Sequence, residues 1–83
     1  MKVKKLLEEA QFEILAGRYD DAKRFLREAL EKEPDNTEIL YNLALVYELL
    51  HDQSEALKYF NRVLEIDPDH SEARKHAERL TEF

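Results

Sequence analysis

The sequence of 83 residues contains no cysteine, a single glycine and two prolines. Without cysteine, the chain can form no disulfide and offers no thiolate to a metal or a catalytic centre. The scarcity of glycine and proline leaves few positions suited to tight turns. Together with 39% charged residues, this composition favours one small domain built from long helices.

Basic residues are outnumbered, with thirteen Lys and Arg against nineteen Asp and Glu and a net charge of −6. This balance disfavours nucleic acid and anionic membranes as partners, because both reward a basic surface. The chain starts with basic residues followed by apolar ones, but Glu8, Glu9 and Glu13 interrupt any signal-peptide core. We therefore expect a cytoplasmic protein.

One stretch, Ile39–Leu50, is apolar or aromatic except at Asn42 and Glu48. Its twelve residues are too few to cross a bilayer, which takes ~20. A helix that is apolar on nearly every side must be covered by other elements. This stretch is therefore predicted to form the middle of the molecule.

The sequence repeats with a period equal to the distance from Pro34 to Pro68. After each proline the same pattern returns, as PDNTE at 34–38 and PDHSE at 68–72. Residues one period apart match in type: Leu6 and Leu40, Ala10 and Ala44, Ala22 and Ala56, Leu26 and Phe60, Leu30 and Leu64. The chain therefore holds two units and the first half of a third.

Apolar residues within each unit recur at steps of three and four, which predicts helices over roughly 2–16, 20–32, 37–50 and 54–66, with a fifth from Ser71. Gly17 is expected to close the first helix in the left-handed conformation. Asp35, Asp52 and Asp69 are each followed three residues later by Glu, which predicts that these three acids cap helix starts. The expected fold is an all-α, antiparallel array of helical hairpins.

This helix–turn–helix period resembles that of the tetratricopeptide repeat family. The second unit fits the family pattern at Leu40, Leu43, Ala44, Tyr47, Ala56, Phe60, Val63 and Pro68. The first unit departs from it at Glu9 and Glu13, where Leu and Tyr are usual, as expected of a first helix with no preceding unit to cover it. The resemblance implies one domain over 1–83, with repeats at 3–36 and 37–70 and a capping helix at 71–83, at which the array is expected to stop.

Signatures of catalysis are not found in the sequence: it has no Gly-rich phosphate loop, nucleophile motif or metal-ligand spacing. His70 and His76 are expected on different faces of a helix, and Glu72 with His76 is interpreted as an ordinary helical pair rather than a metal site. We predict a protein that is not an enzyme and needs no cofactor.

In the family, the first helices of successive units line a concave groove that receives partner peptides. The resemblance implies a partner-binding surface at Leu7, Gln11, Leu15, Tyr41, Asn42, Leu45, Leu49, Lys75 and Arg79. Tyr41, Leu45 and Leu49 form one apolar column that packing between units is expected to need least. Two interpretations stay open: the terminal helix covers part of the column and the rest is ordinary exposed apolar surface, or the column accepts an amphipathic helix or an extended peptide. Lys75, His76 and Arg79 are expected to form a basic rim, or else a solvated cap.

Some members of the family grip a terminal carboxylate with two lysines, two asparagines and one arginine. Of those five places this chain matches only Asn42, because Leu7, Gln11, Glu72 and His76 occupy the others. The resemblance therefore implies a module that binds a protein or peptide without this clamp. Two alternatives stay open: self-association as a homodimer through the same apolar strip, and an engineered scaffold without a natural partner.

Overall fold

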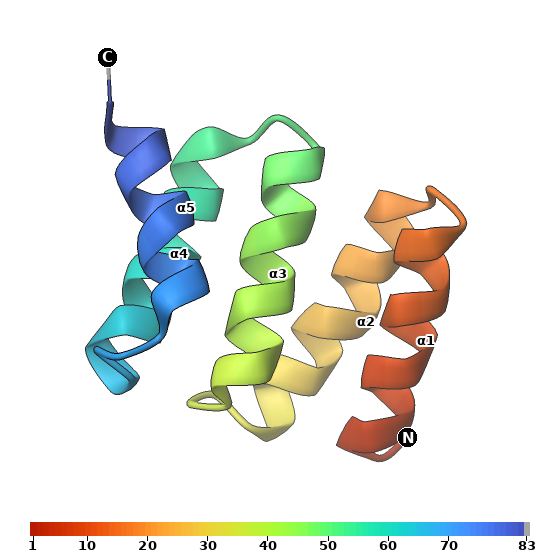
Figure 1. Ribbon diagram of the computed structural model, residues 1–83. Helices are drawn as coiled ribbons and strands as arrows, with labels where there is room; N and C mark the ends of the chain where they lie inside the picture. The colour runs from red at the N-terminus through yellow and green to blue at the C-terminus, as the bar shows by residue number, and fades with distance from the viewer. Residues whose placement is uncertain (83) are drawn as a thin grey trace.

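A computed structural model describes residues 1–82 and contains five helices in that range. They are α1 (Val3–Leu15), α2 (Tyr19–Lys32), α3 (Thr37–Leu49), α4 (Gln53–Ile66) and α5 (Ser71–Thr81). Successive helices run in alternating directions and follow one another across the molecule in chain order (Figure 1). Each helix packs against its neighbours in the chain, so the prediction of an all-α hairpin array is confirmed.

The repeat period of the sequence holds in the structure as well. The bounds of α3 are those of α1 moved by one period, and the bounds of α4 are those of α2 moved by the same distance along the chain. The fifth helix also starts one period after α3, and it ends at Thr81. The predicted capping helix extends to Phe83, which lies outside the described residues. The division into units at 3–36, 37–70 and 71–83 stays a prediction.

The two hairpins close through the same turn. Gly17 has a φ of 77° and His51, one repeat later, a φ of 63°. In each turn the following amide reaches back to the helix: Arg18 N donates to Glu13 O (2.8 Å) and Asp52 N donates to Tyr47 O (2.9 Å). These bonds, with the left-handed residue before them, form a Schellman motif. The predicted role of Gly17 is confirmed.

The helix starts differ from the prediction at two of three places. Asp52 caps α4 as expected, accepting a hydrogen bond from Glu55 N (3.2 Å). The cap of α3, however, is Asn36, whose Oδ1 accepts from Glu38 N and Ile39 N. The cap of α5 is His70, whose Nδ1 accepts from Ala73 N (3.0 Å). The predictions for Asp35 and Asp69 are therefore wrong, because each of these acids precedes the true cap by one residue.

The core follows the repeat and is densest around α3. Leu26 and Phe60, one period apart, are both fully buried, as are the small residues Ala22 and Ala56 that allow close helix contact. On α3, six apolar residues are buried: Ile39, Leu40, Leu43, Ala44, Val46 and Tyr47. The stretch predicted to form the middle of the molecule is therefore its middle (Figure 1).

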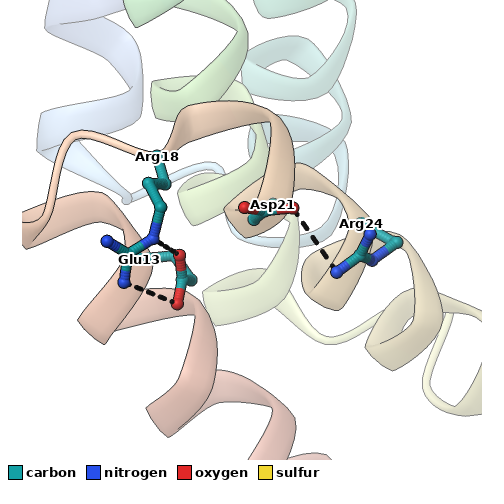
Figure 2. Close-up of polar contacts among 4 residues, drawn as sticks. All are labelled: Glu13, Arg18, Asp21 and Arg24. Carbon is teal, nitrogen blue, oxygen red and sulfur yellow. Dashed lines mark hydrogen bonds and ion pairs between the residues drawn. The ribbon is translucent and has the colours of Figure 1, made fainter.

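The first helix replaces this apolar face with charge. Its positions equivalent to Ile39, Leu43 and Tyr47 are Lys5, Glu9 and Glu13. Lys5 pairs with Glu9 (3.5 Å), and Arg18 from the following turn reaches back to Glu13 (2.5 and 3.2 Å; Figure 2). The main helix contact of α1 is with α2. The side of α1 that carries these charged residues has no preceding helix to cover it within residues 1–82, and it forms the end of the described array.

Candidate functional site

The nine predicted partner-binding residues lie on the first helices of the three units. Together they are called the first-helix surface here. It comprises Leu7, Gln11 and Leu15 on α1; Tyr41, Asn42, Leu45 and Leu49 on α3; and Lys75 and Arg79 on α5. The structure shows which of these side chains meet and which are free to touch another molecule.

Gln11 and Asn42 join the first two units across this surface. Gln11 Nε2 donates to Asn42 Oδ1 (3.2 Å), and Asn42 Nδ2 donates to the carbonyl of Glu38 (2.9 Å). Asn42 is only 9% exposed, whereas Gln11 is exposed. The Asn42 amide is thus held from both sides, which fixes its position and leaves Gln11 as the more accessible of the two.

Tyr41 contributes more to packing than the sequence predicts. Its ring lies edge-on to Phe60 (5.8 Å between ring centroids) and contacts the rings of His70 (4.9 Å) and His76 (6.1 Å). Burial, followed by the nearby carboxylates of Glu72 and Glu48, raises the pKa of its hydroxyl. The expectation that Tyr41 is little needed for packing between units is therefore wrong, because it holds α5 against α3 and α4.

The two histidines that are expected on different faces of a helix meet on Tyr41. His70 precedes α5 and caps it, so it is not on a helical face at all. His76, on α5, stacks on Phe60 with 4.8 Å between centroids and 8° between planes. The prediction fails because it assumes that both histidines lie inside the helix.

The expected basic rim is largely neutralised by acidic partners. Arg79 forms an ion pair with Glu48 on α3, and His76 Nδ1 lies 3.0 Å from the same carboxylate. Lys75 pairs with Glu72 on its own helix (3.6 Å). Glu48 is the residue that sequence reasoning missed, since a contact between residues 31 positions apart has no local signal. The result is an ordered ion-pair cluster beside the apolar strip.

The apolar members divide into two groups by exposure. Leu7 and Leu45 are half-buried and pack against the core. Leu15 and Leu49, one repeat apart, are exposed at 87% and 43% respectively. These two leucines have apolar surface to offer a partner: most of the Leu15 side chain and somewhat less than half of Leu49.

No group of three or more His, Asp and Glu side chains within residues 1–82 is placed to hold a metal ion. None of the helices described combines the length and the apolar character that spanning a membrane requires.

The Glu13–Arg18 pair is well formed: the hydrogen bond from Arg18 lowers the pKa of Glu13, and the same bond raises the pKa of Arg18.

The fold and this surface together define a helical repeat protein whose units are hairpins of equal length. A family model described as Tetratricopeptide repeat matches residues 13–80, and this chain belongs to that family. Membership implies a protein–protein interaction module.

Two relatives place the chain further. A TPR repeat-containing protein of Methanocaldococcus jannaschii is 33% identical over 54 residues, which is 65% of this chain and 17% of that protein. A solved structure, the MamA RS-1 ArsTM double mutant, has a TM-score of 0.89 at 27% identity and covers 94% of this chain. The chain spans 44% of that structure, so it is similar to less than half of either protein.

Proposed function

We propose that this chain is a non-catalytic module that binds an amphipathic helix or an extended peptide on its first-helix surface. The observation that supports the proposal is the exposure of Leu15 and Leu49 at equivalent positions of successive units. Leu45 lies one turn before Leu49 and Leu7 two turns before Leu15, both half-buried, so a partner would meet apolar side chains from two preformed helices. The proposal includes no cofactor.

The charged residues of the surface set the orientation of the partner rather than most of the affinity. Glu48 holds Arg79 and His76 at one edge, so this edge is ordered before binding. Gln11 retains an exposed amide for the backbone or a polar side chain of the partner. With a net charge of −6, the module is expected to take protein partners in the cytoplasm rather than nucleic acid or membranes.

Peptide display tests the proposal directly, because it selects ligands from a random library. Peptides selected on the wild-type protein would be titrated against wild type, Leu49→Glu and Leu15→Glu by calorimetry. Placing a carboxylate where a leucine is to be buried costs about 2 kcal/mol of binding free energy, or roughly 30-fold in Kd. Circular dichroism of each variant establishes that helicity is unchanged.

Ile66→Glu is the matched control. Ile66 is 38% exposed, similar to Leu49, but it ends α4 and lies outside the first-helix surface. Binding should be the same for this variant as for wild type. Equal loss in Ile66→Glu, or full binding in both leucine variants, would contradict the proposal.

Self-association is a second candidate, favoured by one additional residue. Phe12 is 61% exposed and lies three residues before Leu15 on α1, so the end of this helix offers two large apolar side chains. A second copy packed there would bury both. Sedimentation velocity at micromolar concentration tests this: the wild-type protein should dimerise, and Phe12→Glu should stay monomeric. A wild-type protein that is also monomeric would exclude the dimer.

A further inference from the structure

An apolar hollow lies away from the first-helix surface. It sits between α2 and α4 and has a volume of about 400 Å³. Its lining consists of Leu30, Pro34, Leu40 and Tyr59 together with the charged Lys58, Arg62 and Glu65. A neighbouring hollow of about 250 Å³ shares Leu30 and Tyr59 and adds Arg27 and Glu31. A third, of about 510 Å³, continues from Arg27 and Glu31 along α2. These three hollows, joined by shared lining residues, are called the outer groove.

The aromatic wall of the outer groove is held in place. The ring of Tyr59 stacks on Tyr47 with 5.5 Å between centroids and 4° between planes, and Lys58 Nζ lies 5.4 Å from its centroid. Arg27 donates a hydrogen bond to the Tyr47 hydroxyl (2.7 Å). The stacking and the hydrogen bond therefore hold the Tyr59 ring in one position, and a ligand would meet a preformed surface. A preformed surface lowers the entropy lost on binding.

Charge on the outer groove differs from charge on the rest of the chain. The residues that line it include five of the thirteen Lys and Arg of the chain but only four of its nineteen Asp and Glu. Four of these five cations lie within 4 Å of a carboxylate, namely Lys23, Arg24, Lys58 and Arg62. The positive charge that the groove can offer to an acidic ligand is therefore that of Arg27.

Arg27 is the cation of the groove that an acidic group can use. Arg62, at the other end, is engaged by Asp35 (2.6 Å) and Glu65 (3.2 Å), and Lys58 lies 3.8 Å from Glu55. Within residues 1–82, no carboxylate oxygen lies within 4 Å of the Arg27 guanidinium. Its bond to the Tyr47 hydroxyl uses one donor and leaves the others for a ligand.

We propose that the outer groove is a second binding surface, and that it takes an acidic peptide with a bulky apolar residue between carboxylates. The apolar side chain enters the hollow between Leu30, Leu40 and Tyr59. A carboxylate of the peptide accepts hydrogen bonds from Arg27, whose planar guanidinium suits a two-oxygen acceptor. This surface lies mainly on α2 and α4, with Leu40 of α3 at the base of the hollow, and it shares no residue with the first-helix surface, so both can be occupied together.

The test is a titration followed by amide chemical shifts in NMR. Two synthetic peptides carry the same Leu and Phe residues, one flanked by Asp and Glu and the other by Lys. The acidic peptide should shift amides of α2 and α4 in a saturable way and bind more weakly as salt is raised, and the basic peptide should not bind. Shifts confined to α1, α3 and α5 would assign the peptide to the first-helix surface and overturn this proposal alone.

Arg27→Gln should weaken the acidic peptide at least tenfold. Arg74→Gln is the matched control, because Arg74 on α5 also has no carboxylate within 4 Å in the described chain but donates to the Pro68 carbonyl away from the groove. Equal affinity in Arg27→Gln and wild type, or equal binding of both peptides, would overturn the proposal. The proposal would also be overturned if amide shifts on α2 and α4 changed with protein concentration in the absence of peptide. Such changes would assign the groove to a second copy of the chain.

Leu30→Glu tests the hollow independently of Arg27. Leu30 is half-buried, so circular dichroism and unfolding are measured first. If this variant fails to fold, Pro34→Glu replaces it, because Pro34 lines the same hollow and is exposed. Either folded variant should lose the acidic peptide at least tenfold, and retained affinity would count against the hollow as the apolar subsite.

Discussion

Gly17 and His51 lie one repeat apart and both adopt the left-handed conformation, with φ of 77° and 63°. The two residues occupy the same place in equivalent Schellman turns. Only glycine takes this conformation without strain, because in other residues Cβ approaches the following carbonyl oxygen. The second turn therefore carries backbone strain that the first does not.

Replacing His51 with glycine should stabilise the protein by about 0.5–1 kcal/mol, since relief of the strain exceeds the added freedom of the unfolded chain. Conversely, Gly17→Ala should destabilise it by about 1 kcal/mol. A Cβ at Gly17 would meet no atom within 4 Å, so this loss comes from the backbone alone. Urea unfolding measures both changes, and a His51→Gly variant no more stable than wild type would contradict the account.

The histidine cap of α5 can be compared with the asparagine cap of α3, because Asn36 and His70 are one period apart. His70→Ala removes the acceptor for Ala73 N and the ring contact with Tyr41, and should cost about 1 kcal/mol or more. His70→Asn restores an acceptor of the kind that α3 uses. Amide hydrogen exchange in α5 should be faster in His70→Ala than in His70→Asn; equal rates would show that the cap contributes nothing.

The Glu13–Arg18 pair should make stability depend on pH in the acid range. Its hydrogen bond holds the pKa of folded Glu13 below the ordinary value of 4.5. A carboxyl group whose pKa is lower in the folded than in the unfolded protein adds stability at pH values above its pKa in the unfolded protein. This contribution is lost as the pH falls through the pKa of the folded state. Wild type should therefore exceed Glu13→Gln in stability at neutral pH, and the difference should vanish in acid below the folded pKa.

Asp21→Asn is the control for that comparison. Asp21 and Arg24 form a single contact of 3.4 Å within one helix, whereas Arg18 donates hydrogen bonds to both carboxylate oxygens of Glu13 (Figure 2). Isolated pairs three residues apart on a helix contribute only a few tenths of a kcal/mol. The pH dependence should survive in Asp21→Asn, and its disappearance there would assign it to another group.

Phe60 should be the most sensitive core position of the second unit. It is fully buried between Tyr41 and the stacked ring of His76. Phe60→Ala should cost about 3–5 kcal/mol, a large part of the roughly 5–15 kcal/mol that stabilises a typical domain. The equivalent residue of the first unit is Leu26, so Phe60→Leu should be tolerated better; urea midpoints that place the two variants together would contradict this.

Much of the architecture could be predicted because it depends on local spacing. The recurrence of apolar residues at three and four positions places one stripe on each helix, and the return of the pattern after each proline fixes the number of hairpins. The cap positions were harder to predict, because Asp35 and Asn36 are neighbours and both can cap a helix. The backbone path into α3 puts the Asn36 side chain, not that of Asp35, over the first amides.

The candidate surface was predictable only as a set of positions. The sequence indicates that Leu15 and Leu49 are equivalent, but their exposure of 87% and 43% depends on how far the neighbouring helices cover each one. In the same way, the sequence alone left open whether the terminal helix covers Tyr41. It is partly covered because His70 and His76, from the cap and body of α5, lie against its ring.

By itself, the sequence determined the five helices, their antiparallel order, the family and the polar first helix, since each depends on residue type and on spacing along the chain. Only the tertiary structure decided that Arg79 and His76 would meet Glu48, that Gln11 would bond to Asn42, and that a groove with an apolar hollow would open between α2 and α4. The partners in these contacts come from different helices. Their distances are set by how the helices cross, which no local pattern encodes.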